Sequence, residues 1–275
     1  MMNRIFKLLS IVLISISQNY SVFGQTPTRI VSLAPSLTKN VYFLEQQHKL
    51  VGCTSYCDTA VANGKEVVAS AVKVNIEKVV SLKPDLVITT TMTNPETLDM
   101  LKKFNIRVET FPTAKSFDEI CKQTIRLGQI IGAESNAKRI VTQSEIKIKS
   151  LASSTRKDKS PSVFFQIGAK PLFTVIPGTF MNDYIVFAGG KNIVTNTKTG
   201  SITREAVIAS NPDVIFVVTM GIVGEEEKKI WESYSTINAA KNKKVFIIDS
   251  NDSCTPTPVT FVKTLERIID LIYSK

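Results

Sequence analysis

The sequence predicts an α/β protein with two similar lobes, each built on a mostly parallel sheet, and with a single long helix that bridges them. Three observations lead to this prediction. Short runs rich in Val, Ile and Leu alternate with helical patterns, the second half of the chain repeats the plan of the first, and one uninterrupted helical pattern stands between the halves. A length of 275 residues suits two lobes, since domains commonly hold roughly 100–150 residues.

The first half of the chain alternates between strands and helices. Its strands are expected at Arg29–Leu33, Leu50–Cys53, Asp85–Thr89 and Ile106–Thr110, and its helices at Thr38–Leu44, Ile76–Leu82, Pro95–Phe104 and Phe117–Ile131. The last helix follows Ser116, and Glu119 stands where it would complete a capping box. Continuous apolar strands between helices are typical of a parallel sheet covered on both faces, as in a Rossmann-like lobe.

The second half repeats this plan after a long helix. Glu134–Leu151 contains neither Gly nor Pro and would be about 27 Å long at 1.5 Å per residue, enough to bridge two lobes. We therefore divide the chain into an N-terminal lobe over 25–133, a bridging helix over 134–152 and a C-terminal lobe over 153–275. In the last part strands are expected at Ser162–Ile167, Asp213–Thr219 and Val245–Asp249, and helices at Phe180–Phe187, Arg204–Ser210, Glu225–Glu232 and Val259–Tyr273.

Residues 1–24 have the layout of a secretory signal peptide. Arg4 and Lys7 give a basic start, Leu8–Ile16 is an apolar stretch, and small residues precede Gln25. The apolar stretch is too short for a stable membrane-spanning helix. The protein is therefore expected outside the cytoplasm, in the periplasm.

Composition and residue counts exclude several classes of function. Apolar residues make up 43% and charged residues 21% of the chain, which is typical of a globular protein. A single histidine, His48, argues against a histidine-rich zinc site and against a Ser-His-Asp hydrolase, and there is no GxxxxGK[ST] or GxGxxG motif. Among the four cysteines, Cys53 and Cys57 are close enough to form a disulfide if their segment is a loop, and no metal site is expected.

A repeated motif links the two halves. EKVVSLKPD, which begins at Glu77, matches EAVIASNPD, which begins at Glu205, and each motif is followed by an apolar strand. Each Glu falls in the first turn of a short helix, where the helix dipole favours a carboxylate, and the proline ends that helix. Capping alone would explain one such residue. Two carboxylates at equivalent positions of two lobes indicate a pair of negative charges displayed on one edge of the molecule.

Over residues 28–275 the chain resembles the substrate-binding proteins of ABC importers for vitamin B12, haem and ferric siderophores, whose lobes are joined by one rigid helix. The resemblance lies in RIVSLAPSLTKN (29–40), LVGCTSYCD (50–58), VNIEKVVSLKPDLVIT (74–89), PLFTVIPGTFMNDYIVFAGGKNI (171–193) and ITREAVIASNPDVIFV (202–217). It implies a ligand held between the lobes, and it implies that Glu77 and Glu205 pair with arginines of a permease dimer in the membrane. We expect a monomer with no cofactor of its own and no nucleic-acid partner.

The ligand-binding residues expected from this resemblance are Tyr56 in the N-terminal lobe and Phe173, Asn251 and Asp252 in the C-terminal lobe. Tyr56 follows the second strand, and ligands of open α/β sheets bind at the carboxyl ends of strands. Its phenol would pack on a macrocycle or ligate haem iron. Asn251 and Asp252 would hydrogen-bond amide groups of the ligand, although a solvated turn is the alternative for them, as is a tyrosine without a ligand role for Tyr56.

The cobalamin-binding members are the most similar, through the SY-D segment after the second strand and the PLFT loop. The chain departs from them at Ala71, Thr90 and Thr199, where tryptophans are common, and its one tryptophan, Trp231, is expected to pack inside the second lobe. Lys39 likewise stands where the first motif usually has Glu.

We rank a corrinoid first, because a large, amide-rich ligand suits a cleft of small neutral groups. Haem and a ferric siderophore remain alternatives. The chain shows no convergent set of arginines for an anionic siderophore. A secreted hydrolytic enzyme with Glu77 and Glu205 as its catalytic pair is the least favoured reading, since the two residues lie on separate lobes.

Overall fold

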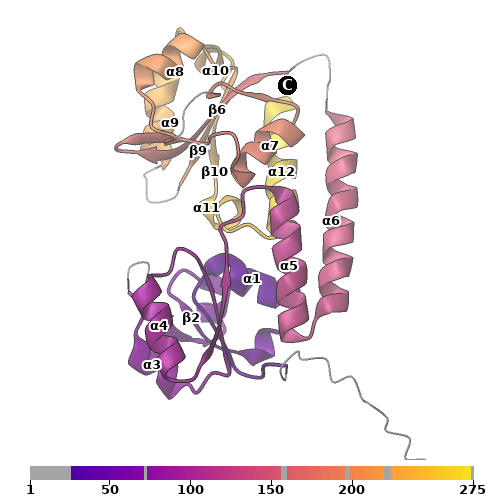
Figure 1. The fold of residues 1–275 in the computed structure, drawn as a ribbon. Coiled ribbons are helices and arrows are strands. Elements are labelled where there is room, and N and C mark those ends of the chain that lie inside the picture. The colour runs from indigo at the N-terminus through magenta and orange to yellow at the C-terminus, as the bar shows by residue number, and fades with distance from the viewer. Residues whose placement is uncertain (1–25, 71–72, 156–159, 196–198, 220–223, 274–275) are drawn as a thin grey trace, which may run out of the picture.

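The computed structural model describes residues 26–70, 73–155, 160–195, 199–219 and 224–273. The predicted signal peptide and Ala71 lie outside these residues. The chain forms two lobes, one above the other in Figure 1, and helices α5 (Phe117–Ile131), α6 (Glu134–Ser154) and α12 (Pro258–Tyr273) lie along one side. Within the described residues, no helix combines the length and the apolar character that a membrane span requires.

The N-terminal lobe is a parallel sheet with helices on both faces. Its strands β1 (Ile30–Ser32), β2 (Leu50–Thr54), β3 (Glu66–Ala69), β4 (Leu86–Thr90) and β5 (Arg107–Phe111) are arranged in the order β3-β2-β1-β4-β5. The helices are α1 (Pro35–Phe43), α2 (Asp58–Ala62), α3 (Ile76–Ser81) and α4 (Pro95–Lys103), with a short 3-10 helix η1 (Gln47–Lys49). Ile30 packs in the core on one face, whereas its neighbour Val31 packs in the core on the other. The prediction of a sheet covered on both faces is therefore confirmed.

The C-terminal lobe has a mostly parallel sheet. Its strands are β6 (Ser162–Ala169), β7 (Leu172–Thr174), β8 (Lys191–Asn192), β9 (Val214–Val218) and β10 (Val245–Ile248). They follow the order β10-β9-β6-β7 with β8 beside β6, and only the β6–β7 pair is antiparallel among the strands described. The other helices are α7 (Phe180–Phe187), α8 (Arg204–Ser210), α9 (Gly224–Ser233), α10 (Asn238–Lys241) and α11 (Ser250–Ser253).

The elements predicted from the sequence have the type that the structure shows, and α5, α7 and α8 have the predicted bounds. Helix α1 begins three residues earlier than predicted, because Pro35 occupies the first turn, where its fixed φ suits a helix and its missing N–H is not needed. The prediction missed β3, β7, β8, α2, α10 and α11. None of these has more than five residues, too few to show a helical or strand period.

Helix α6 bridges the lobes as predicted, and α5 lies beside it and also contacts both cores. The first half of α6 places Ala137 in the core of the N-terminal lobe, and its second half places Ile148 in the core of the C-terminal lobe. Helix α5 runs beside it in the opposite direction: Phe117 packs in the C-terminal core and Leu127 in the N-terminal core. The single bridging helix expected from the sequence is thus one member of an antiparallel pair, which buries apolar side chains along its length and is stiffer than an isolated helix.

The repeated motif has a structural role in each lobe through its aspartate. Asp85 accepts hydrogen bonds from the backbone N–H and hydroxyl of Thr28, at 2.7 and 2.8 Å, and from the backbone N–H of Arg29 at 3.0 Å. Asp213 accepts the same pair from Ser162, at 2.9 and 2.8 Å, and a third from Asn238 Nδ2 at 3.1 Å. Each aspartate therefore fixes the start of the central first strand of its lobe.

Trp231 packs inside the second lobe, as predicted. Its indole is buried, and Nε1 donates a hydrogen bond to Gln166 Oε1 at 2.6 Å. Gln166 Nε2 in turn donates to Glu227 Oε2 at 2.8 Å, and Arg204 Nη2 pairs with the same oxygen at 2.6 Å. The guanidinium carbon lies 4.8 Å from the centre of the indole ring. This network joins α8 and α9 to β6 and satisfies a buried carboxylate.

Candidate functional site

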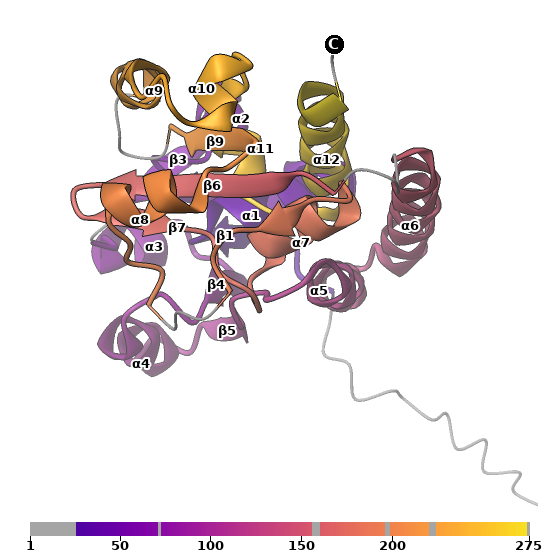
Figure 2. The same cartoon turned by 90° about the horizontal axis from the view of Figure 1, so that it is seen from above.

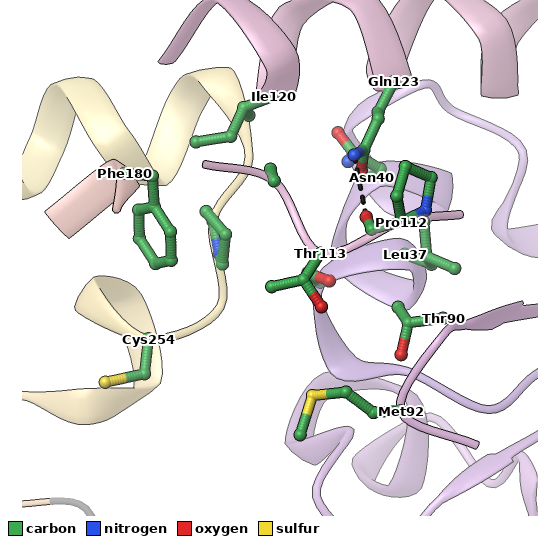
Figure 3. Close-up of a pocket in the computed structure, with 13 residues that line it drawn as sticks. Leu37, Asn40, Thr90, Met92, Pro112, Thr113, Ile120, Gln123, Phe180 and Cys254 are labelled. Atoms are coloured by element: carbon green, nitrogen blue, oxygen red, sulfur yellow. Dashed lines mark hydrogen bonds between the residues drawn. The ribbon is translucent and has the colours of Figure 1, made fainter. Parts of the chain in front are cut away.

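A pocket lies between the lobes, at the carboxyl ends of the N-terminal strands. Its volume is about 590 Å³, including the part open to solvent. Helix α1 and the segments after β4 and β5 supply one wall, and α7 with the segment after α11 supplies the other (Figure 3). The lining residues are Ser36, Leu37, Asn40, Thr90, Met92, Pro112, Thr113, Ala114, Ile120, Gln123, Phe180, Cys254 and Pro256.

The position of this pocket follows from the strand order. In the N-terminal sheet the order reverses between β1 and β4, and crevices at such switch points are where open α/β sheets bind ligands. Met92 follows β4, and its side chain is 84% exposed. Met92, Thr113 and Phe180 line this pocket but are not among the ligand residues expected from the sequence. For Met92 and Thr113 the available signal was their position after the predicted strands Asp85–Thr89 and Ile106–Thr110, which end at the same edge of the sheet as the loop that carries Tyr56.

The pocket lining carries no charged side chain among the described residues. Asn40, Gln123, Thr90 and Thr113 supply amide and hydroxyl groups, and the remaining lining is mostly apolar. Gln123 Nε2 donates to the carbonyl oxygen of Pro112 at 2.8 Å, and Figure 3 shows this bond as a dashed line. The arrangement suits a ligand with an apolar body and neutral polar groups.

The four predicted ligand residues do not meet in this pocket, and none of them lines it. Tyr56 is 59% exposed in the turn between β2 and α2, and Phe173 is 36% exposed on β7. They are large apolar side chains displayed on different lobes. Asn251 and Asp252 lie on α11 and contact the N-terminal lobe instead.

Lys39 explains where Asn251 and Asp252 point. Its ammonium donates to the backbone carbonyl of Asn251 and lies 3.3 Å from Asp252 Oδ1. Lys263 on α12 lies 2.6 Å from Asp252 Oδ2, and Asn251 Nδ2 donates to Asp58 Oδ2 at 3.2 Å. Burial tends to raise the pKa of Asp252, but the hydrogen bond from Lys263 and the charge of Lys39 outweigh it and hold that pKa below its ordinary value. Both side chains are therefore engaged with protein groups of the two lobes, so they do not form the freely solvated turn considered from the sequence, and their ligand-binding role stays a prediction.

Two buried thiols, Cys53 in β2 and Cys57 in the loop of Tyr56, lie close to each other. Cys53 and Cys57 are free and buried, so the disulfide that the sequence allowed is not formed. Cys57 Sγ instead lies 3.1 Å from the hydroxyl of Thr38 and 3.2 Å from that of Thr54. The hydrogen bond between the thiols, together with burial, raises the pKa of Cys53. The same bond lowers the pKa of Cys57, with the hydroxyls of Thr38 and Thr54 adding to the effect against burial.

Other candidate ligand groups lie away from the pocket. His48 is in η1, which precedes β2 and is therefore at the opposite end of the sheet from the pocket. Among the described arginines, Arg107 and Arg126 pair with Glu109, and Arg29 donates to the carbonyl oxygen of Leu82. The described residues also contain no cluster of three or more His, Cys, Asp or Glu side chains that could hold a metal ion.

Glu77 and Glu205 are exposed in the first turns of α3 and α8. Asn75 caps α3 by accepting from Lys78 N at 2.9 Å, and Thr203 caps α8 by accepting from Ala206 N at 3.2 Å. Hydrogen bonds from its own backbone N–H and from Thr203 lower the pKa of Glu205. Figures 1 and 2 both show α3 and α8 on the side of the molecule opposite α6, one in each lobe.

Comparison with known proteins agrees with this architecture. A family model for periplasmic binding proteins matches residues 30–251. The chain is 34% identical over 257 residues to the uncharacterized ABC transporter substrate-binding lipoprotein YvrC of Bacillus subtilis (strain 168), which covers 90% of this chain and 80% of that protein.

Two solved structures that are 27% and 25% identical in sequence share the fold of this chain. A possible iron-binding (periplasmic solute-binding) protein from Staphylococcus epidermidis has a TM-score of 0.80 and 27% identity, covering 91% of this chain and 100% of that one. The periplasmic vitamin B12 binding protein BtuF of Vibrio cholerae has a TM-score of 0.74 and 25% identity, covering 90% and 97%. Members of this family are extracytoplasmic and work with a membrane permease and an ATPase. With its two parallel-sheet lobes and the pocket between them, the chain belongs to the periplasmic binding protein family, as an ABC transporter substrate-binding protein similar to vitamin B12-binding and possible iron-binding members.

Proposed function

We propose that this protein captures a corrinoid between its lobes and delivers it to a membrane permease. The observation that carries the proposal is the neutral lining of the interlobe pocket, with amide and hydroxyl groups beside apolar ones. A corrinoid has a broad apolar ring system with many amide side groups, so its chemistry matches these residues. The similarity to the vitamin B12 binding protein of Vibrio cholerae supports the same choice.

The pocket would hold only part of such a ligand. Pockets of about 300–1,000 Å³ enclose ligands of drug size, and a corrinoid is larger. The rest of the macrocycle would extend from Met92, which lines the pocket, toward the exposed side chains of Tyr56 and Phe173. Burying these apolar surfaces against the ligand provides the main gain in binding free energy, at roughly 25 cal/mol per Å².

The second candidate is an iron-containing ligand, either haem or a ferric siderophore. The similarity to the possible iron-binding protein of Staphylococcus epidermidis favours it. Haem carries two propionates and most siderophores are anionic, so both call for cations in the binding site. The pocket lining has none among the described residues, which is why the corrinoid ranks first.

Thermal unfolding with and without ligand tests the choice. A ligand at 100 times its Kd stabilises the native state by about 2.7 kcal/mol, which corresponds to a rise of roughly 5–10 °C in Tm for a chain of this size. We expect this rise with cyanocobalamin. A rise with haemin or a ferric siderophore alone would overturn the corrinoid proposal and favour the iron-containing ligand.

We also propose that Glu77 and Glu205 dock the permease, one lobe to each subunit of a dimer. Their helices lie on one side of the molecule, and exposed ion pairs of this kind orient docking more than they add affinity. Glu77→Ala with Glu205→Ala should abolish ligand uptake by cells and leave ligand affinity unchanged. The matched control is Glu96→Ala with Glu225→Ala, since both residues are also exposed glutamates in first turns, on α4 and α9. Equal uptake by the two double variants would contradict the docking role.

We also propose where the protein acts and in which oligomeric state. The basic and apolar sequence of residues 1–24 supports secretion to the periplasm. We propose that the protein acts there as a monomer, without a cofactor or a nucleic-acid partner, and without enzymatic activity. The separation of Glu77 and Glu205 onto helices of different lobes supports the last point, because a general acid and base must meet at one substrate.

A further inference from the structure

Four side chains form a polar connection between the lobes, separate from the helix pair. Lys39 on α1 and Asp58 on α2 belong to the N-terminal lobe, whereas Asn251 and Asp252 lie on α11 of the C-terminal lobe. The ammonium of Lys39 binds both the Asn251 carbonyl and the Asp252 carboxylate, 3.3 Å away. Asn251 Nδ2 donates to Asp58 Oδ2 at 3.2 Å. We call these four residues the interlobe clamp.

The clamp is attached directly to the loop of Tyr56. Asp58 begins α2, two residues after Tyr56, so the bond from Asn251 holds the end of that loop. Thr38, the neighbour of Lys39 on α1, lies 3.1 Å from the thiol of Cys57 in the same loop. One turn of α1 therefore contacts the Tyr56 loop through Thr38 and the opposite lobe through Lys39.

The Lys39–Asp252 pair is more enclosed than the surface ion pairs of this protein. The exposed fractions of its side chains are 18% and 24%, whereas Lys263, the other partner of Asp252, is 73% exposed. Ion pairs that are partly buried are screened less by salt than exposed ones. The Lys39–Asp252 contact, which crosses the lobes, is therefore weakened less by salt than the Lys263–Asp252 contact, which lies within the C-terminal lobe.

We propose that the interlobe clamp sets the distance between the lobes and, through it, the position of Tyr56. Lys39 and Asp252 are then positioning residues: they hold the ligand-binding surfaces at a fixed spacing without touching the ligand. Holding the site in its binding geometry before the ligand arrives lowers the ordering cost of binding. The part of this inference that concerns ligand affinity rests on the proposed function.

Lys39→Met removes the charge and keeps the length of the side chain, and Lys39→Arg keeps the charge. Lys263→Met is the matched control, because Lys263 pairs with the same carboxylate from within the C-terminal lobe. The first measurement is hydrogen–deuterium exchange of residues 54–63 in the free protein. We expect exchange at least several-fold faster in Lys39→Met, and exchange like that of the unmodified protein in Lys39→Arg and Lys263→Met.

The second measurement is the affinity for cyanocobalamin, which we expect to be several-fold weaker in Lys39→Met only. Unchanged exchange in Lys39→Met, or equal acceleration in Lys263→Met, would overturn the clamp, as would an affinity that is unchanged or tighter in Lys39→Met. If exchange accelerates as expected but the unmodified protein does not bind cyanocobalamin, the clamp stands and the corrinoid proposal fails.

Discussion

Replacing Asp213 tests whether the two lobes share one structural plan. Asp85 and Asp213 stand at equivalent positions of the repeated motif, and each fixes the first strand of its own lobe. Asp213→Ala removes the acceptor of three hydrogen bonds, two from Ser162 and one from Asn238. Asp85→Ala removes three from Thr28 and Arg29. Asp213 is only partly exposed, whereas Asp85 is exposed, so water replaces the lost bonds more easily at Asp85.

The magnitude follows from these contacts. A hydrogen bond to a charged group contributes about 1.5–3 kcal/mol when its partner would otherwise be left unpaired, and less where water replaces it. We therefore expect Asp213→Ala to lower the free energy of unfolding by about 2–3 kcal/mol and Asp85→Ala by about 1–2 kcal/mol. For a chain of this size, the first value corresponds to a fall in Tm of roughly 4–12 °C.

Urea denaturation at several pH values measures both the cost and its origin. Burial tends to raise the pKa of Asp213, but the hydrogen bonds from Ser162 and Asn238 outweigh it and hold that pKa below its ordinary value. A carboxylate of this kind stabilises the fold fully above its unfolded-state pKa of about 3.9, and the contribution is lost as the pH falls through the lower folded-state pKa. The difference between Asp213→Ala and the unmodified protein should therefore shrink below about pH 4.

The control is Asp99→Ala, which removes an exposed carboxylate paired with Lys102, and which should cost at most about 0.5 kcal/mol. If Asp213→Ala costs no more than this control, the aspartate of the repeat does not fix the strand. A cost that stays constant from neutral pH to pH 3 would refute the electrostatic part of the reasoning.

Three further outcomes follow from the described contacts. Thiol titration of the denatured protein should find four free thiols, whereas two would show that one pair is bridged. Trp231→Phe should lower the free energy of unfolding by about 2–3 kcal/mol, measured by urea denaturation, because it leaves a buried acceptor unpaired; no loss would contradict the network. Tyr56→Ala should weaken ligand affinity about tenfold or more in a calorimetric titration, and Phe104→Ala, at a similar exposure just after the end of α4, should not. Equal affinities would remove Tyr56 from the site.

The regular part of the fold could be predicted because its elements carry clear periods and caps. Helix α5 has the predicted bounds: Ser116 caps it by accepting from Glu119 N at 3.2 Å, and Gly132 ends it at a positive φ. The side chain of Glu119, however, accepts from the N–H of Lys115 and not from that of Ser116, so only half of the predicted capping box forms. The sequence pattern also could not show that α5 packs against both lobes. An amphipathic stripe shows that one face of a helix is buried, but not which core buries it.

The site was harder to predict, because its residues come from segments that meet only in three dimensions. Asn251 and Asp252 are polar residues after the last strand, which is where ligand groups often lie, but Lys39, more than 200 positions earlier, binds them. Met92 was missed because a single methionine in a turn carries no periodic signal. Only the strand order places it at the switch point of the sheet.

Oxidation of Met92 tests most directly whether the ligand is bound between the lobes. Mild peroxide converts an exposed methionine to its sulfoxide, which mass spectrometry quantifies at each position. Met92 is 84% exposed at the pocket, and Met100, 46% exposed on α4, is the control outside it. With saturating cyanocobalamin, we expect slower oxidation of Met92, because the bound corrinoid covers it, and no change at Met100. Equal oxidation of Met92 with and without the corrinoid would contradict it.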